Sequence, residues 1–364
     1  MALLKIRDQI YSGIIGHAIG DALGVPVEFT DRETLRRSPV SGMIGFGSHG
    51  QPAGTWSDDT SMEIALMQSI IDNGKINLDD VMQRFCDWLL DNKYTATGST
   101  FDSGVTCSSA IYDYLHNKNV HTCGRTDERS NGNGSLMRIL PIAFICYGYG
   151  LSGNARYLLV RNISALTHAH EISVLGCYIY VDFVCHLLDG KDKFTAYEHT
   201  QEADYSMFSD ESLTTYHRIL YDNIYERKED EIQSSGYVVS SLEAALWCLL
   251  TSGNYPAATL KAVNLGRDTD TVAAITGSMA GICYPDSVPL AWLSSLKRID
   301  YLTQIARDFA EIDIAIDSIW AQIPRFKYRG IFHSYSKVSR KAFIRSSLLS
   351  KFSPWARCSF TLFW

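Results

Sequence analysis

The sequence predicts an all-α protein whose main part, residues 1–324, folds as a single compact domain. Nearly every long apolar pattern recurs at intervals of three and four residues, as at Val81, Phe85 and Trp88. The alternation typical of strands is scarce. Helix-capping residues precede the apolar patterns and glycines follow them, and no repeat or flexible linker divides residues 1–324. We therefore expect roughly a dozen helices around one core.

The first predicted helix carries four glycines on one face, Gly13, Gly16, Gly20 and Gly24. A glycine inside a helix costs about 1 kcal/mol relative to alanine. The close approach of a second backbone is a better explanation for the stripe than chance. We predict that this helix packs tightly in the centre of the domain.

Later helices have equally clear predicted boundaries. Asn77 is placed to cap a helix that begins at Leu78, and Thr60 and Ser240 each stand three residues before a glutamate, which is the capping-box spacing. Three glycines end apolar runs: Gly190, Gly253 and Gly266. Residues 190–238 form a polar excursion between helices.

The composition is that of a folded protein in a reducing compartment. Hydrophobic residues make up 46% and charged residues 20% of the 364 residues, which excludes disordered, collagenous and coiled-coil proteins. Nine cysteines are scattered without a Cys-x-x-Cys pair. They predict free, mostly buried thiols in the cytoplasm rather than disulfides or a zinc site. No uninterrupted apolar run approaches the roughly 18 residues of a membrane span, and the N-terminus lacks the apolar core of a signal peptide.

Charge divides the chain unevenly. Residues 325–364 hold nine Lys/Arg and no Asp/Glu, which leaves 24 basic against 40 acidic residues, a net charge of −16, on residues 1–324. An acidic main domain argues against a nucleic-acid partner. The basic, aromatic tail is expected to be a poorly ordered extension, and contact with an anionic partner or membrane surface is the alternative. Deletion of residues 331–364 should leave activity intact.

Two acidic clusters lie at predicted helix starts, in residues 54–60 and 266–271. The helix dipole favours acidic residues there, so capping is the simplest explanation. The density of hard oxygen donors exceeds that need and suits Mg²⁺ or Mn²⁺ better than zinc. The candidate ligands are Ser57, Asp58, Asp59, Asp268, Asp270 and Thr271. Carboxylates brought together would repel unless cations lie between them, but the 209 positions between Asp59 and Asp268 leave their convergence open.

Three further segments could serve a binding site. Glu28 follows Val25-Pro26-Val27 and should lie on a loop, where an exposed glutamate is the simplest interpretation. The turn of residues 132–135, Gly-Asn-Gly-Ser, precedes an apolar helix expected to open at Leu136, and backbone N–H groups at such a start can hold phosphate. His168 ends an apolar helical segment and, taken alone, would more often be a core residue.

Five motifs in order resemble the ADP-ribosylglycohydrolase family, which includes ADP-ribosylarginine and ADP-ribosylserine hydrolases. They are GHAIGDALG at 16–24 followed by Glu28, WSDDT at 56–60, GNGSLMR at 132–138, Thr167-His168, and GRDTDT at 266–271. The resemblance extends from about residue 8 to about residue 322. It implies an orthogonal helical bundle around a dinuclear Mg²⁺ or Mn²⁺ centre held by the six ligands named above.

The resemblance also implies roles for single residues. Glu28 would lie over the metals and the scissile bond, and Glu28 and Asp59 are the implied catalytic residues. The substrate-binding residues would be Asp102, Gly132, Asn133, Gly134, Ser135 and His168. The glycine turn would hold the diphosphate of ADP-ribose, with Ser135 as a side-chain donor. Arg138, beyond the turn, is expected to be a structural ion-pair partner. Ser103 departs from the Phe-Asp-Ile-Gly element of many family members, which weakens the assignment of Asp102.

The implied activity is metal-dependent hydrolysis of the glycosidic bond between ADP-ribose and an arginine- or serine-type side chain, or a small conjugate. Two Mg²⁺ or Mn²⁺ ions would bind the vicinal hydroxyls of the distal ribose and activate water, and Glu28 would manage a proton. We expect a cytoplasmic monomer without a membrane span. Two alternatives stay open: an ADP-ribose-binding protein without turnover, and a two-metal phosphohydrolase acting on ADP-ribose. The reaction products separate the three hypotheses. A glycohydrolase would release free ADP-ribose, a binding protein would release nothing, and a phosphohydrolase would release AMP with ribose phosphate.

Overall fold

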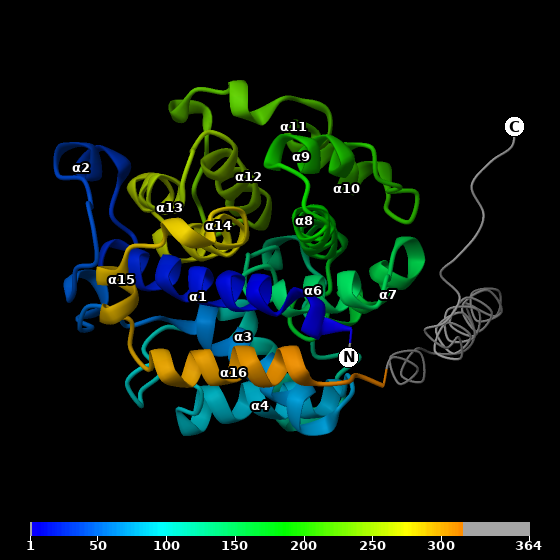
Figure 1. The fold of residues 1–364 in the computed structure, drawn as a ribbon. Coiled ribbons are helices and arrows are strands. Elements are labelled where there is room, and N and C mark those ends of the chain that lie inside the picture. Colours follow the sequence, from blue (N-terminus) through cyan, green and yellow to red (C-terminus); the bar gives the residue numbers. More distant parts are fainter. Residues whose placement is uncertain (1, 316–364) are drawn as a thin grey trace, which may run out of the picture. The chain divides into compact units, whose positions relative to one another are not determined.

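A computed structural model of the chain describes residues 2–315, and every regular element in that range is helical (Figure 1). The β interactions of these residues are isolated bridges, such as Gly132 with Tyr237. The predicted all-α class is therefore confirmed. All described residues belong to one compact unit. The predicted boundary at residue 324 and the basic tail, residues 325–364, lie outside the described residues.

The described residues contain sixteen α-helices. The first eight are α1 (Arg7–Gly24), α2 (Arg32–Arg37), α3 (Asp58–Asn73), α4 (Leu78–Asp91), α5 (Val105–Asn117), α6 (Leu140–Gly148), α7 (Gly153–Ser164) and α8 (Glu171–Leu188). The other eight are α9 (Lys193–Gln201), α10 (Asp210–Thr215), α11 (His217–Tyr221), α12 (Val238–Leu250), α13 (Tyr255–Asn264), α14 (Thr269–Cys283), α15 (Leu290–Ser295) and α16 (Ile299–Glu311). The predicted polar excursion contains the short helices α9 to α11.

Helix α1 crosses the middle of the bundle, with α14 on one side and α16 on the other (Figure 1). The glycine stripe faces α14, as the sequence predicts. A Cβ atom on Gly20 would lie 2.0 Å from the carbonyl oxygen of Ala273, and one on Gly24 would lie 2.3 Å from Cα of Asp270. Such distances leave no room for a side chain, so the two backbones meet through glycine. This contact fixes the start of α14 against the end of α1.

Helix boundaries partly follow the predictions. The Asn77 side chain accepts a hydrogen bond from the backbone of Asp80 and caps α4, as expected. The two predicted capping boxes are wrong. Helix α3 is capped by Ser57 and α12 begins at Val238, so Thr60 and Ser240 lie inside helices. The Thr60 hydroxyl instead donates to a buried carboxylate, which is described below.

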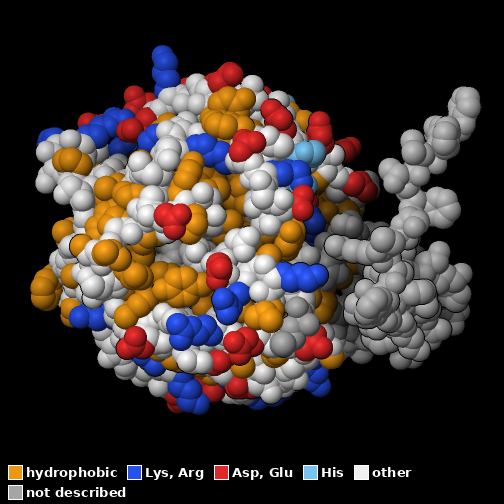
Figure 2. Space-filling view, viewed as in Figure 1, with side chains coloured by type: hydrophobic (Ala, Val, Ile, Leu, Met, Phe, Trp, Pro, Cys, Tyr) orange, Lys and Arg blue, Asp and Glu red, His pale blue; other side chains and the backbone are white. Residues whose placement is uncertain are grey.

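The eight cysteines of the described residues are all free thiols, and seven are buried. Two helical segments, Leu3–Val27 and Glu171–Leu188, are long and apolar enough to cross a membrane. In each of them 83% of the apolar window is buried inside the bundle, as is usual for core helices. Figure 2 shows Lys/Arg and Asp/Glu side chains interspersed on the face seen in Figure 1, with hydrophobic side chains across its middle.

Candidate functional site

The two acidic clusters converge where the N-termini of α3 and α14 meet. The Thr271 hydroxyl lies 3.3 Å from Oδ2 of Asp59, and the Ser57 hydroxyl lies 3.0 Å from the same oxygen. The close packing of Gly24 on Asp270 holds the start of α14 in this place. Residues more than 200 positions apart thus share one acidic site at two helix N-termini, where the helix dipoles favour negative charge.

Asp21 is buried beside this site and holds the first turn of α3. The sequence analysis assigned it no role. Its carboxylate is fully buried and accepts hydrogen bonds from the backbone N–H groups of Ser57 and Thr60, at 2.9 Å and 3.2 Å. It also accepts the Thr60 hydroxyl at 2.6 Å. Asp21 therefore fixes the first turn of α3. The only available signal was its place inside the GDALG motif.

Two groups of side chains could each hold a metal ion. In one, Asp21, Asp59 and Asp270 place carboxylate oxygens within 4.8 Å of one another. In the other, a ring nitrogen of His49 and carboxylate oxygens of Glu28, Asp102 and Asp270 lie within 4.8 Å of one another. The two groups share Asp270, which suits a pair of neighbouring cations. The predicted hydroxyl ligands Ser57 and Thr271 adjoin the first group.

The donor set fits a hard divalent cation. Buried carboxylate and hydroxyl oxygens are the ligands that Mg²⁺ and Mn²⁺ prefer. Oδ1 of Asp59 is buried and has no hydrogen-bond partner among the described residues. A buried carboxylate oxygen without a donor is costly unless a cation satisfies it. The number and identity of the ions stay predictions.

The electrostatics of the site also call for positive charge. Burial raises the pKa of Asp58, of Asp59 and of Asp270 well above the ordinary range, and the charges of neighbouring carboxylates raise each pKa further. Burial likewise raises the pKa of Asp268 and of Asp102. These carboxylates repel one another when ionised. Bound cations would allow all of them to ionise together.

Glu28 lies on a loop, as the proline predicted, but it is not exposed. A 3₁₀ turn, Val25–Val27, follows α1 and delivers Glu28 to the site with 7% of its surface exposed. Its carboxylate pairs with Nε2 of His49, a residue that sequence reasoning missed. Burial raises the pKa of Glu28 to about 7 despite the lowering effect of this hydrogen bond. A lone histidine in a glycine-rich segment gives no signal that would have found His49.

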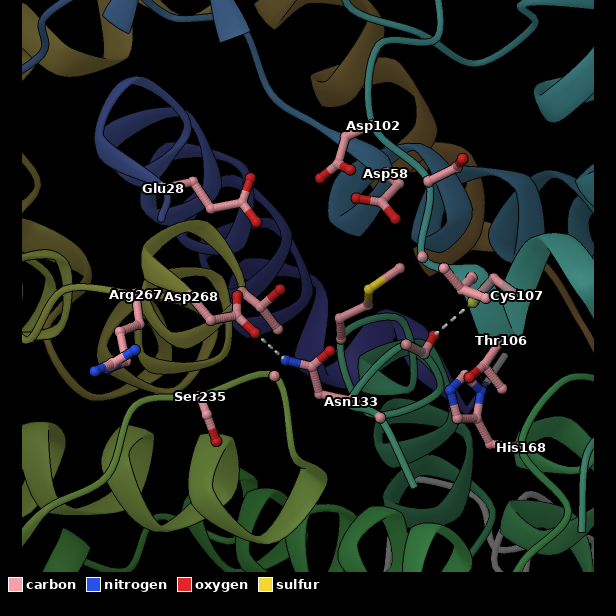
Figure 3. A pocket seen from close by; sticks show the side chains of 18 of the residues that line it. Glu28, Asp58, Asp102, Thr106, Cys107, Asn133, His168, Ser235, Arg267 and Asp268 are labelled. Atoms are coloured by element: carbon pink, nitrogen blue, oxygen red, sulfur yellow. Dashed lines mark hydrogen bonds between the residues drawn. The ribbon is translucent and has the colours of Figure 1, made fainter. Parts of the chain in front are cut away.

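A cavity of about 600 Å³ opens over the acidic site (Figure 3). This volume lies in the range of small-molecule sites. The predicted residues that line it are Glu28, Asp58, Asp102, Gly132, Asn133, Gly134, His168, Asp268 and Thr271. Ser57, Asp59 and Asp270 are buried beside it. Sequence reasoning missed Phe29, which is 72% exposed, and Arg267, the only Lys or Arg among the lining residues.

The glycine turn forms one wall of the cavity. The Asn133 side chain donates from Nδ2 to Oδ2 of Asp268 at 2.7 Å and to the Ser241 hydroxyl at 2.9 Å, so it supports the acidic cluster directly. The expected helix start at Leu136 is wrong. Residues 134–138 form turns and α6 begins at Leu140, because Pro141 is favoured in the first turn of a helix.

The position of Ser135 argues against its predicted role as a hydrogen-bond donor to the diphosphate. Its side chain is fully buried and is not among those lining the cavity. The hydroxyl lies 3.4 Å from Sγ of Cys177 and accepts a hydrogen bond from the Ser164 hydroxyl at 2.9 Å. The turn directs this side chain into the core and leaves its glycines facing the cavity.

His168 and Arg138 lie behind the turn. Nδ1 of His168 is 2.8 Å from the Thr167 hydroxyl, and its ring lines the cavity. Burial, together with the Arg138 charge, lowers the pKa of His168 to about 3. The predicted ion pair of Arg138 is wrong. Its guanidinium donates to the Gly134 carbonyl and, at 2.8 Å, to the Thr167 hydroxyl, neither of which is charged.

Comparisons with known proteins agree with this geometry. The family model described as ADP-ribosylglycohydrolase matches residues 3–317. The chain is 31% identical over 309 residues to an ADP-ribosylarginine hydrolase of Serratia proteamaculans, covering 82% of this chain and 78% of that protein. It is 29% identical over 295 residues to the ADP-ribosyl-[dinitrogen reductase] glycohydrolase of Rhodospirillum rubrum, covering 80% and 91%. A solved structure titled ADP-ribosylglycohydrolase-related protein complex superimposes with a TM-score of 0.71 at 27% identity, covering 85% of this chain and 99% of that one.

Proposed function

The chain belongs to the ADP-ribosylglycohydrolase family, and from this premise we propose that it releases ADP-ribose from arginine side chains of modified proteins. The coarser activity, hydrolysis of a glycosidic bond to ADP-ribose, is that of the family. The observation that carries the proposal is the convergence of the starts of α3 and α14 at the floor of a cavity large enough for ADP-ribose.

The residues divide the work of binding and cleavage. The residues that would hold two Mg²⁺ or Mn²⁺ ions are Asp58, Asp59, Asp268 and Asp270, with the hydroxyls of Ser57 and Thr271. Of these, Asp59 and Asp270 belong to the candidate metal groups described above, whereas Asp58 and Asp268 belong to neither. Such ions supply ribose-hydroxyl binding and a water of lowered pKa when bound. Glu28, paired with His49 at the same site, has a raised pKa suited to holding or releasing a proton near neutral pH.

The other end of the cavity suits the diphosphate. Gly132 and Gly134 present backbone without side chains there. Arg267 lines the cavity on the opposite side, where its carbonyl accepts a hydrogen bond from the Phe29 N–H at 2.6 Å. His168 is neutral because of its lowered pKa, so its ring can donate one hydrogen bond without adding charge. In this proposal the scissile bond would lie near Glu28 and the nucleotide near the glycine turn.

The lining of the part of the cavity near Glu28 supports arginine over serine as the proposed acceptor. Glu28, Asp58 and Asp102 face this part from different elements (Figure 3). The exposed ring of Phe29 also lines it. Carboxylates and aromatic faces both attract a planar guanidinium, whereas a serine hydroxyl gains little from either.

The deciding experiment separates acceptors and products by chromatography. The full chain is incubated with arginine- and with serine-ADP-ribosylated proteins in Mg²⁺, in Mn²⁺ and in EDTA. Metal-dependent release of free ADP-ribose from the arginine-linked substrate supports the proposal, and release from serine alone overturns the acceptor. ADP-ribose binding without release would identify a binding protein, and AMP with ribose phosphate would identify a phosphohydrolase.

We also propose that this hydrolase works in the cytoplasm. The support is chemical, because all eight cysteines of the described residues are free thiols and a reducing compartment preserves them. Fractionation of the native host with an antibody against the chain would test the location.

A further inference from the structure

The loop of residues 46–51 packs directly on the turn that delivers Glu28. Phe46 donates its N–H to the Gln51 carbonyl at 2.5 Å and closes the loop. Gly47 has φ of +58°, and a Cβ atom there would lie 1.8 Å from the Pro26 carbonyl oxygen. Only glycine permits this approach, so the loop is fixed against the residues that precede Glu28.

The loop holds Glu28 at two points. The Ser48 hydroxyl donates to the Glu28 backbone carbonyl at 2.5 Å. Nε2 of His49 pairs with Oε2 of Glu28. Within residues 2–315 no other side chain forms a hydrogen bond with the Glu28 carboxylate. The orientation of that carboxylate therefore depends on His49.

The His49 ring is itself held by two aromatic neighbours. Its centroid lies 5.8 Å from that of Phe29 and 5.3 Å from that of Phe101, with tilted planes. Phe29 follows Glu28 in the chain and Phe101 precedes Asp102, so the ring joins two segments that line the cavity. Its side chain is only 11% exposed. A ring packed in this way presents its nitrogen in one direction.

We propose that His49 is a positioning residue that holds the Glu28 carboxylate over the reaction centre. The inference rests on the proposed function, in which Glu28 acts on the scissile bond. Without the imidazole, the Glu28 side chain is free to rotate toward the cavity mouth, and the carboxylate leaves the position that the reaction needs. The loss falls on turnover and spares binding of the nucleotide.

Two substitutions separate the hydrogen bond from the packing. His49→Phe keeps a ring between Phe29 and Phe101 but removes the donor, and His49→Gln keeps an N–H donor at similar reach. His116→Phe, at an exposed histidine of α5, is the control. We expect His49→Phe to lower kcat on the order of 10²-fold, the cost of misplacing a reacting group. KM and the Kd for ADP-ribose should stay at wild-type values, and His49→Gln should recover most of the loss.

Three results would overturn the proposal: wild-type kcat in His49→Phe, equal impairment of both variants, or loss of bound Mn²⁺ from His49→Phe by elemental analysis. The last would make His49 a ligand. Crystal structures of the two variants provide a readout that does not need turnover. The Glu28 carboxylate should leave its place in His49→Phe and keep it in His49→Gln. An unmoved carboxylate refutes the positioning role, whereas a wild-type protein that releases no ADP-ribose refutes the proposed function.

Discussion

Asn133 and Asp268 are joined by a 2.7 Å hydrogen bond from the side-chain amide to the carboxylate. The bond links the glycine turn to the acidic cluster at the start of α14. The second amide hydrogen reaches the Ser241 hydroxyl on α12, so both donors of one NH₂ group are used. A primary amide is the side chain that can satisfy both acceptors here without adding a charge.

Replacement of Asn133 should therefore act through Asp268. Asn133→Asp sets a second carboxylate against Asp268 and should reduce kcat by about 10- to 100-fold, the usual effect of losing a partner that orients a ligand. Asn133→Ala should cost less, because it removes the donor without adding charge. Rates of ADP-ribose release measure both, with the exposed Asn119→Asp as control. Equal rates in Asn133→Asp and wild type would show that the bond is dispensable.

The sequence analysis identified the residues that form short, chemically distinctive motifs. The Ser57 to Thr60 cluster and the Asp268 to Thr271 cluster hold more hard oxygens than helix capping needs, which made a cation site a candidate, and the family resemblance then implied it. The glycine stripe of α1 indicated a close helix contact, because only such a contact compensates for glycine inside a helix. Both inferences used local patterns that the alternative explanations, helix capping for the acidic clusters and chance for the glycines, account for less well.

Other residues were beyond such reasoning because their roles depend on contacts distant in sequence. Asp21 and Ser57 are 36 positions apart, and a carboxylate on a helix gives no sign of its partner. His49 acquires its place from Phe29 and Phe101, on two other segments. The prediction for Ser135 was wrong for a related reason. The spacing of residues in a turn does not indicate which of their side chains face the core. The later start of α6, in contrast, was readable from Pro141.

Metal binding should stabilise the fold as well as support turnover. Asp270 belongs to both candidate metal groups, so Asp270→Asn removes a shared ligand. We expect Mg²⁺ or Mn²⁺ to raise the Tm of the wild type, because a ligand that binds only the folded state stabilises it. The rise should disappear in Asp270→Asn, and turnover should fall by more than about 10²-fold.

The control for this test is Asp91→Asn, at an exposed acidic residue of α4, which should keep both the Tm shift and the activity. Asp58→Asn should resemble Asp270→Asn in turnover. An Asp58→Asn, Asp270→Asn double variant that stays fully active would exclude the cation site as the reaction centre.

The contact of α1 with α14 makes Gly24 a structural support of the site. In Gly24→Ala the added Cβ would meet the backbone of Asp270 at 2.3 Å, and backbone cannot rotate away. We expect a loss of about 3 kcal/mol in unfolding free energy, with loss of activity because Asp270 shifts. Gly13→Ala is the matched control. Its Cβ would meet the Phe144 side chain at 3.0 Å, which can adjust, and alanine favours the helix by about 1 kcal/mol. Urea titrations should separate the two variants, and equal midpoints would argue against backbone contact at Gly24.

The buried His168 predicts loss of stability in mild acid. Burial and the Arg138 charge lower its pKa to about 3 in the folded state, whereas an unfolded histidine titrates near 6.5. Between pH 3 and pH 6.5 this histidine is protonated in the unfolded chain but neutral in the folded chain. Stability is therefore complete above about pH 6.5 and falls as the pH drops toward 3.

His168→Gln removes this one proton difference and leaves the other titrating groups in place. Between pH 6 and pH 4 its unfolding free energy should fall less steeply than that of the wild type. The two slopes should differ by about 1.4 kcal/mol per pH unit, which is the value for one proton. Urea unfolding at several pH values measures both slopes, and the exposed His116→Gln should run parallel to the wild type. If His168→Gln also ran parallel, the histidine would be protonated in the folded protein. A charged His168 would then reach the diphosphate as a cation, because the same imidazole lines the cavity wall beside the glycine turn.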